Sequence, residues 1–511
     1  MTPLRVVLLK PSKYTAAGPV ERFRKGFMPA STLHHIRSMT PPEVEGRPVT
    51  VEIIDEYIET DLRYLDALRP ERCSLLALVG VQSHQMHRAL DLAALARSNG
   101  VRHCIIGGPH AITCDTTEVQ NRGVSFALSE AELIWPRILC DAIAGELQPV
   151  YGTEQRWQSE LDPPVLIPPG RSLLRRYFIP MLGIYPARGC PYNCNFCSVV
   201  KIAGHRIRSQ PVETTVQSVI AARQAGAKMM VFTTDNFNKY PDARPLLERL
   251  IETKMSMPFF VQCDAQVSRD EEFIDLLARA GCIQMFVGVE SFSRKTLHAA
   301  RKHHNDPSQY EEIIRHCRKH GIATHFSTII GFPDQDENDI HENLAELRRM
   351  QPVFTSIWIL TPTPGTDQYD DFMAADWIDE KNLDRFDGTT LVWRHPRLSR
   401  KQLEDFLFRG MRDFYNVPDL VSKALFHPSS PRFALQGRAV DLGYGLFNRL
   451  MVNRRQHPLS GGFGHVKRDG VAEYLPLRKK VFGIEQLQLA RSLKLVNPSD
   501  QRLYAFAAAA K

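Results

Sequence analysis

Short apolar runs rich in β-branched residues alternate with helical patterns through the first part of the chain. This alternation is typical of βαβ units and a parallel sheet. The clearest helical pattern spans 87–97, where apolar residues share one face and Gly100 follows. We expect five strands, at 4–12, 49–57, 73–82, 101–108 and 124–130.

Two segments interrupt this pattern. Residues 14–48 are polar and broken by proline, so we expect a long irregular insertion or lid after the first strand. Residues 148–180 are rich in proline and glycine, with LDPPVLIPPG at their centre, which predicts a linker. The chain is therefore expected to begin with a doubly wound, Rossmann-like α/β domain over 1–147.

A second alternating series follows over 181–375. Helices are expected at 212–225, 243–253 and 270–280, between apolar strand-like runs. Six βα units closed edge to edge form a full or partial (β/α) barrel, so we predict a (β/α)6 partial TIM-type barrel with its chemistry at the carboxyl ends of the strands. Residues 376–511 are expected to form a mainly helical C-terminal domain.

Composition narrows the class of protein. A chain of 511 residues with 43% hydrophobic and 24% charged residues predicts a globular protein of two or three domains. The longest apolar stretch, around 75–81, is too short to span a bilayer, and no signal cleavage site follows the first strand, so we expect a cytoplasmic protein. Basic residues predominate over 449–480, which indicates a solvated helical tail, a peripheral membrane contact or an anionic substrate.

Three cysteines with CxxxCxxC spacing lie in the segment ARGCPYNCNFCSVV, directly after the first predicted barrel strand. They are Cys190, Cys194 and Cys197. Thiolates hold iron–sulfur clusters, and three of them on a four-iron cluster leave one iron open. Structural zinc normally takes four ligands, and the nearest further candidates, His205 and Cys263, are isolated. A buried cysteine triplet is disfavoured by Asn193 and Asn195.

The triplet, with Phe196 just before its last cysteine, resembles the radical S-adenosylmethionine (SAM) superfamily, and the resemblance covers about 182–374. It implies a 4Fe-4S cluster held by the three cysteines. It also implies SAM on the open iron, cleaved by one electron to a 5′-deoxyadenosyl radical that abstracts hydrogen. Phe196 is then a candidate for cofactor binding.

The same resemblance gives a meaning to three later strand ends. The segment FTTDN lies where members of the family bind the amino group of the methionine part of SAM, although it departs from the usual Gly-Gly-Glu. The alternative is that it caps the following helix. VGVES matches the strand end near the ribose, again with a cap as alternative, and STIIGFPDQDEND matches the glycine-rich segment beside the adenine. The candidates are Thr234, Asp235, Asn236, Glu290, Ser291 and Gly331.

The first domain resembles the cobalamin-binding domain that precedes many of these barrels. CIIGGPHA and VGVQSHQMH end two neighbouring strands, and the resemblance makes their loop residues cobalamin-binding candidates, namely Gln82, Ser83, His84, Gly107 and Gly108. No DxHxxG occurs here, so neither His84 nor His110 is identified as an axial ligand to cobalt. The family's Gly-Glu-Gly-Glu turn appears as Ser129, Glu130, Ala131 and Glu132.

Together these resemblances imply a cobalamin-dependent radical SAM methyltransferase acting on an unactivated carbon of a small or lipid-like metabolite. An electron donor such as flavodoxin or ferredoxin is implied as a partner. A radical cyclase, oxidative or C–C coupling enzyme without methyl transfer is the main alternative. A non-catalytic iron–sulfur protein and an RNA-modifying enzyme are further ones, but no basic segment carries interleaved aromatics, so no nucleic acid partner is expected.

Overall fold

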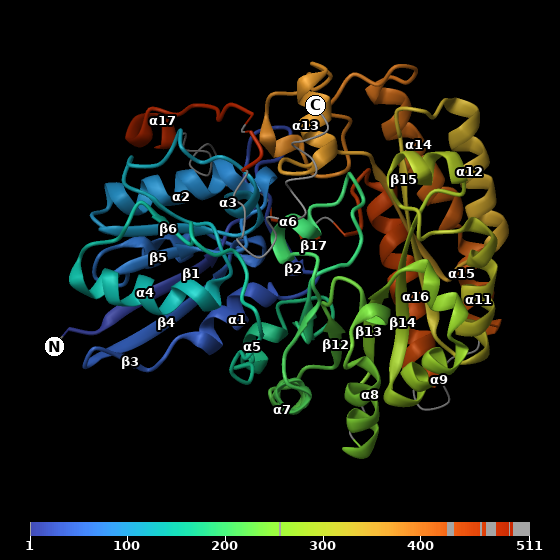
Figure 1. Ribbon diagram of the computed structural model, residues 1–511, viewed down its shortest axis with the longest axis horizontal. Helices are drawn as coiled ribbons and strands as arrows, with labels where there is room; N and C mark the ends of the chain where they lie inside the picture. Colours follow the sequence, from blue (N-terminus) through green and yellow to red (C-terminus); the bar gives the residue numbers. More distant parts are fainter. Residues whose placement is uncertain are drawn as a thin grey trace.

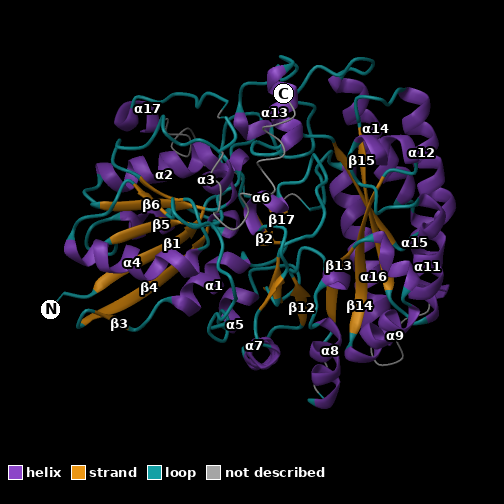
Figure 2. Cartoon of the chain, in the orientation of Figure 1, coloured by secondary structure: helices purple, strands orange, loops and turns teal. Residues whose placement is uncertain are grey.

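The computed structural model describes residues 2–254, 257–426, 434–459, 462–466, 477–489 and 491–493. Two parallel sheets lie side by side with helices against them, and a mainly helical C-terminal part covers the second sheet (Figures 1 and 2). The predicted fold class is confirmed: a doubly wound N-terminal unit precedes a partial (β/α)6 barrel.

The first sheet has seven strands in the order β3-β4-β1-β5-β6-β7-β8, parallel except for β3 against β4. Its strands are β1 (Leu4–Lys10), β3 (Glu43–Val44), β4 (Arg47–Asp55), β5 (Leu75–Leu78), β6 (His103–Gly107), β7 (Ser125–Ala127) and β8 (Val150–Tyr151). Helices α1 (Ser31–Met39) and α4 (Ala131–Ala144) pack on one face and α2 (Met86–Ser98) on the other. Strand β1 is apolar throughout because Val6 and Leu8 face α1 and α4, whereas Val7 and Leu9 face α2.

Two expectations for this region need correction. Residues 14–48 are not an irregular insertion, because they contain β2 (Phe23–Gly26) and α1 as well as β3. Strand β2 pairs antiparallel with β17 (Gly462–His465), more than four hundred residues away. The local sequence pattern therefore could not predict this pairing. The segment expected as a linker supplies β8, the last strand of the first sheet, and the short helix α5 (Arg171–Leu174).

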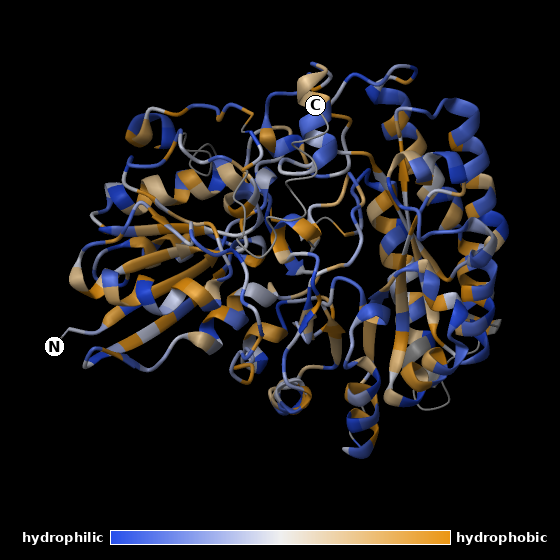
Figure 3. Ribbon diagram, in the orientation of Figure 1, coloured by the Kyte–Doolittle hydropathy of each residue, from blue (hydrophilic) through white to orange (hydrophobic). Residues whose placement is uncertain are grey.

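The second sheet has six parallel strands in the order β16-β15-β14-β13-β12-β9. These are β9 (Met181–Ile184), β12 (Met229–Phe232), β13 (Phe259–Cys263), β14 (Cys282–Glu290), β15 (Ala323–Ile330) and β16 (Phe354–Ile359). The connecting helices are α7 (Val212–Gln224), α8 (Ala243–Glu252), α9 (Glu271–Ala280), α10 (Arg294–Ala299), α11 (Tyr310–Lys319) and α12 (Glu337–Met350). In Figure 3 the strands of both sheets are mainly hydrophobic, whereas α11 and α12 consist mainly of hydrophilic residues.

The C-terminal part packs on both units. It contains α13 (Asp367–Ala374), α14 (Arg400–Phe414), α15 (Val417–Phe426), α16 (Ala434–Asn453) and α17 (Leu477–Phe482). Helix α14 lies on β16, whereas α17 returns to α2 of the first unit, where Arg478 Nη1 lies 2.5 Å from Asp91 Oδ2 (Figure 1). Within the described ranges, every helix is too short or too polar to cross a membrane.

Several basic residues expected on a charged tail contact other parts of the protein. Arg478 is buried against Asp91, Arg455 pairs with Asp405, and Arg449 Nη1 donates to the Tyr415 carbonyl. Lys467 and Arg468 lie outside the described residues. These contacts give no support to the membrane contact considered from the sequence.

Candidate functional site

The cysteine loop leaves the barrel through the short hairpin β10 (Ala187–Arg188) and β11 (Arg208–Ser209), and α6 (Val199–Ala203) follows the last cysteine. Gly189 has φ +107°, and a Cβ there would lie 2.3 Å from the Arg206 carbonyl oxygen, so glycine is required. Its N–H donates to Asp235 Oδ2 at 2.8 Å, and the Cys190 N–H donates to the Gly204 carbonyl at 3.1 Å. The loop that carries the first cysteine is therefore held at fixed points.

All three cysteines of the motif line one cavity of about 210 Å³ at the carboxyl ends of the barrel strands. Burial raises the pKa of Cys190, that of Cys194 to about 11 and that of Cys197 to about 12. The free side chains are thus thiols at neutral pH, and binding of iron must displace their protons.

The donor set fits a cluster better than a single ion. Among the described residues, no three His, Cys, Asp or Glu side chains converge closely enough for one metal ion. A cubane attaches each thiolate to a different iron, so its three ligands surround a volume instead of meeting at a point. Three thiols around one cavity satisfy that requirement.

A buried ion pair forms another wall of this cavity. Glu290 ends β14 at an irregularity in the β14–β15 register, with φ +61°, and its Oε1 lies 2.9 Å from Lys302 Nζ. Burial alone would lower the pKa of Lys302, but Glu290 and the neighbouring Cys194 sulfur hold it above its usual value. Lys302 therefore places a fixed positive charge beside the cysteines, which no sequence motif had indicated.

Asn236 belongs to a polar cluster around Asp264, at the end of β13. Asp264 accepts from Asn236 Nδ2 and Asn238 Nδ2, each at 2.8 Å. Tyr192, between the first two cysteines, stacks on His304 with centroids 3.5 Å apart. Asn236 makes no side-chain capping bond to the 3-10 helix that follows it, so the structure does not favour the helix-cap alternative there.

The remaining sequence candidates of the barrel fall into two groups. Phe196, Asp235, Asn236 and Glu290 line the 210 Å³ cavity with the cysteines, whereas Thr234, Ser291 and Gly331 lie outside its lining. Thr234 Oγ1 is buried and finds no hydrogen-bond partner among the described residues. Ser291 Oγ donates to Asn343 Oδ1 at 3.1 Å.

Local structure explains why residue 331 is a glycine. It has φ +81°, and a Cβ there would lie 2.9 Å from Leu403 of α14. The N–H of Gly331 donates to Gln335 Oε1 at 2.8 Å. The glycine is thus required by backbone conformation and by the packing of the C-terminal part.

A second cavity, of about 420 Å³, lies between the first sheet and the barrel. Gln82, Gly107 and Gly108 line it from the carboxyl ends of β5 and β6, and Tyr185 and Arg188 line it from the barrel. Its position at the carboxyl edge of a doubly wound sheet is where such folds bind ligands, and its volume suits a small-molecule site.

Two predicted residues of the first domain do not reach this cavity. Ser83 Oγ instead lies 3.0 Å from His110 Nδ1. His84 is partly buried, and desolvation lowers its pKa to about 3. Gly108, with φ +129°, has a packing reason of its own, since a Cβ would lie 2.2 Å from the Val81 nitrogen.

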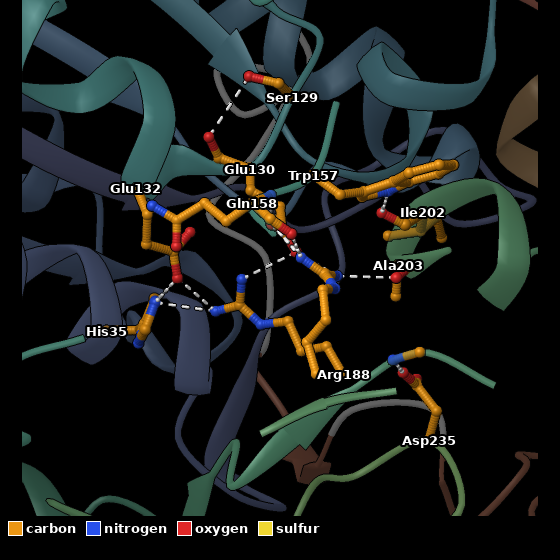
Figure 4. A network of polar contacts seen from close by, with 12 residues as sticks. His35, Ser129, Glu130, Glu132, Trp157, Gln158, Arg188, Ile202, Ala203 and Asp235 are labelled. Carbon is orange, nitrogen blue, oxygen red and sulfur yellow. Dashed lines mark hydrogen bonds and ion pairs between the residues drawn. The ribbon is translucent and has the colours of Figure 1, made fainter. Parts of the chain in front are cut away.

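A network of charged residues joins the two units at the edge of the larger cavity (Figure 4). Arg208 donates to both oxygens of Glu130, at 2.6 and 2.8 Å. Arg188 Nη2 donates to Glu132 Oε1 at 2.7 Å, and His35 Nε2 lies 2.6 Å from the same oxygen. Since Arg188 stands two residues before Cys190, these ion pairs tie the cysteine loop to the first domain.

Asp235 is the residue shared by the two cavities, because its side chain contributes to the lining of both. Burial raises the pKa of its carboxyl above the usual value, and the Gly189 N–H opposes that shift. Of the twelve cofactor-binding candidates from the sequence, Asp235 alone occupies this common wall.

Residues 184–347 match the family described as the Radical SAM superfamily. The chain therefore contains a radical SAM domain. The matched segment contains the three cysteines, Asp235 and Glu290, so residues of the radical SAM domain line the smaller cavity.

The similarity to curated relatives extends beyond that domain. Bacteriochlorophyllide d C-8(2)-methyltransferase of Chlorobaculum tepidum is 24% identical over 414 residues, 77% of this chain and 87% of the relative. Hopanoid C-2 methylase of Rhodopseudomonas palustris is 25% identical over 434 residues, 80% of this chain and 77% of the relative. The similarity thus includes most of both units.

Solved structures support the same architecture. The radical S-adenosylmethionine methyltransferase TsrM from Kitasatospora setae, solved with cobalamin and a 4Fe-4S cluster, matches with a TM-score of 0.57 and 17% identity over 87% of this chain and 91% of that chain. The cobalamin-dependent S-adenosylmethionine radical enzyme OxsB, solved with aqua-cobalamin, matches with a TM-score of 0.60 and 15% identity over 88% of this chain and 72% of that chain. At these identities the likeness is one of fold.

Proposed function

We propose that this protein is a cobalamin-dependent radical SAM methyltransferase that methylates an unactivated carbon of a small or lipid-like metabolite. The observation that carries the proposal is that Asp235 lines both cavities, so the 420 Å³ cavity between the first sheet and the barrel adjoins the cysteine-lined cavity. The names of the relatives, a bacteriochlorophyllide methyltransferase and a hopanoid methylase, support carbon methylation of such substrates.

Each cavity fits one cofactor by its own chemistry. When bound, the cluster with SAM supplies a hydrogen-abstracting radical and cobalamin supplies the methyl group. Cys190, Cys194 and Cys197 would hold the cluster, while Asp235, Asn236 and Glu290 offer oxygen acceptors beside it to the polar groups of SAM. Gln82, Gly107 and Gly108 would border cobalamin.

The chain's own contribution is geometric. The ion pairs of Arg188 and Arg208 hold the cysteine loop against the first domain, so the two cofactors would share one substrate space. Apolar residues from β5, β6 and α4 line much of the larger cavity, which limits water near a reactive intermediate.

The test is anaerobic reconstitution of the full chain with iron, sulfide and hydroxocobalamin. We expect roughly four irons and one corrinoid per chain, 5′-deoxyadenosine under reducing conditions, and transfer of a deuterated methyl group from SAM to a supplied bacteriochlorophyllide or hopanoid precursor. A protein that forms 5′-deoxyadenosine but binds no corrinoid would refute methyl transfer through cobalamin.

Radical chemistry without methyl transfer is the second candidate. It is favoured by the anaerobic magnesium-protoporphyrin IX monomethyl ester cyclase of Cereibacter sphaeroides, which is 25% identical over 250 residues, 47% of this chain and 39% of that protein. Product mass separates the two functions, because methylation adds a methyl group whereas cyclisation removes hydrogen.

Reductive cleavage of SAM needs one electron per event, so we propose a small electron-transfer protein such as flavodoxin or ferredoxin as a partner. This requirement, together with ten unpaired cysteines, suits the reducing cytoplasm. Replacing a chemical reductant by either protein in the reconstituted assay tests the partner directly.

A further inference from the structure

Glu132 lines the larger cavity, and one of its two carboxylate oxygens is buried without a hydrogen-bond partner among the described residues. Its Oε1 is engaged by Arg188 Nη2 at 2.7 Å and by His35 Nε2 at 2.6 Å. Its Oε2 is buried and meets no hydrogen-bond donor in the part of the chain that the structure describes. The side chain is 7% exposed and belongs to the lining of the 420 Å³ cavity.

In the neighbouring Glu130, by contrast, both carboxylate oxygens accept hydrogen bonds from the protein. Its Oε1 accepts from Arg208 at 2.8 Å and from Arg188 at 3.3 Å, and its Oε2 accepts from Arg208 at 2.6 Å and from the Gln158 N–H at 2.8 Å. Figure 4 shows these contacts as dashed lines, whereas only one carboxylate oxygen of Glu132 carries any. Both glutamates line the cavity, but Glu132 alone of the two keeps an open oxygen.

The open oxygen is an acceptor and cannot donate. Burial alone would raise the pKa of Glu132, but Arg188 and His35 together hold it below its usual range, so the carboxylate is ionised. A buried carboxylate oxygen that meets no donor destabilises the folded protein. A ligand that supplies an N–H or O–H at this point removes that penalty.

The chemistry of the surroundings selects a neutral donor. The charge of Glu132 is already balanced by Arg188, and the adjacent wall is apolar, with Ile134, Trp135 and Ile138 from α4. A cationic ligand would add an unbalanced charge to this wall. A primary amide supplies N–H donors without net charge, and amides of this kind surround the rim of a corrinoid.

We propose that Glu132 Oε2 accepts a hydrogen bond from a peripheral amide of the bound corrinoid, which makes Glu132 a specificity-determining residue for amidated corrinoids. This inference rests on the proposed function. The two glutamates of the Ser129–Glu132 turn then have different roles. Glu130 joins the two units, whereas Glu132 joins them and also binds a peripheral amide of the corrinoid.

The substitution Glu132→Gln tests the inference with little change of shape. Its carbonyl oxygen can keep the contacts of Oε1, because turning the amide would aim an NH2 group at the Arg188 guanidinium. The NH2 group then replaces Oε2 and converts the acceptor in the cavity into a donor.

The ligands are hydroxocobalamin and a heptamethyl ester corrinoid, whose rim carries acceptors only. Affinities are measured on cluster-reconstituted protein by ultrafiltration and cobalt quantitation, independently of turnover. We expect the amide-to-ester affinity ratio to fall at least 10-fold in Glu132→Gln. Comparing this ratio between proteins cancels the contribution of the nucleotide tail, which the ester lacks.

The matched control is Glu130→Gln, the same change two residues earlier, at a carboxylate whose oxygens are both occupied by protein donors. It is expected to weaken the protein without altering the amide-to-ester ratio. A ratio unchanged in Glu132→Gln, or changed equally in both variants, would overturn the inference while leaving the proposed function intact. Failure of the unsubstituted protein to bind either corrinoid would instead refute the proposed function, and this inference with it.

Discussion

Replacing Arg208 by methionine should loosen the cysteine loop from the first domain. The Arg208 and Glu130 side chains are 4% and 5% exposed, and their two N–H···O bonds measure 2.6 and 2.8 Å. Removing one partner of a buried ion pair costs about 3–5 kcal/mol. Glu130 keeps Arg188 at 3.3 Å and the Gln158 N–H at 2.8 Å, so we expect the lower end, about 3 kcal/mol.

Amide hydrogen exchange measures this loss locally. The Cys190 N–H donates to the Gly204 carbonyl and the Gln210 N–H to the Pro186 carbonyl, and both bonds belong to the hairpin that carries Arg208. A decrease of about 3 kcal/mol in the free energy of opening accelerates exchange roughly 150-fold, since each 1.4 kcal/mol is about a factor of ten.

The control is Arg244→Met, which removes an ion pair with Asp270 whose side chains are each 46% exposed. Exposed pairs contribute about 0–1 kcal/mol, so exchange at the hairpin should stay within about fivefold of the parent. If Arg208→Met accelerates exchange at Cys190 and Gln210 no more than Arg244→Met does, the ion pairs do not hold the loop and the reasoning is refuted.

Four further outcomes are expected. Alanine at all three motif cysteines should reduce reconstituted iron from roughly four per chain to near zero while near-ultraviolet circular dichroism stays unchanged, and retained iron would contradict the cluster assignment. Asp235→Asn should raise the KM for SAM about tenfold or more at constant iron content, because a neutral amide binds an ammonium group weakly; an unchanged KM would exclude that contact. Lys302→Met should lower thermal stability by leaving Glu290 buried without its cation, and adding Glu290→Gln should restore part of it, as calorimetry can measure. Burial lowers the pKa of His325 to about 3, so its contribution to stability is complete above pH 6.5 and lost as pH falls toward 3; the thermal midpoint of His325→Gln should therefore fall less steeply between pH 6.5 and 4.5.

Much of the architecture could be predicted from local pattern. The strands of the two parallel sheets are buried on both faces, so they stand out as apolar runs, and the helices between them carry ordinary end signals. Asp270, for example, accepts the Phe273 N–H at the start of α9, and Gly281 with φ +115° ends it. The cysteine spacing was equally readable because its ligands lie within eight residues of one another.

Other features were not predictable because they depend on distant partners. Strand β2 has only four residues, two of them exposed, and exists through pairing with β17. The ion pair of Glu130 and Arg208 joins residues 78 positions apart; the turn that contains Glu130 was recognisable in the sequence, but no local signal identified Arg208 as its partner. Lys302 reaches Glu290 from a polar loop that reads as an ordinary exposed segment. For such residues the signal lies in tertiary packing.

The return of α17 to α2 has a consequence for how the chain is made. The Arg478 N–H donates to Asp91 Oδ1, and the Leu487 N–H donates to His87 Nε2, so buried polar groups of α2 are satisfied by residues 387 and 400 positions later in the chain. The N-terminal unit therefore cannot reach its final packing before residues 478–487 have been synthesised, although domains generally fold in the order in which they are made. Fragments ending before residue 477 should accordingly need a chaperone or a supplied C-terminal peptide to stay in solution.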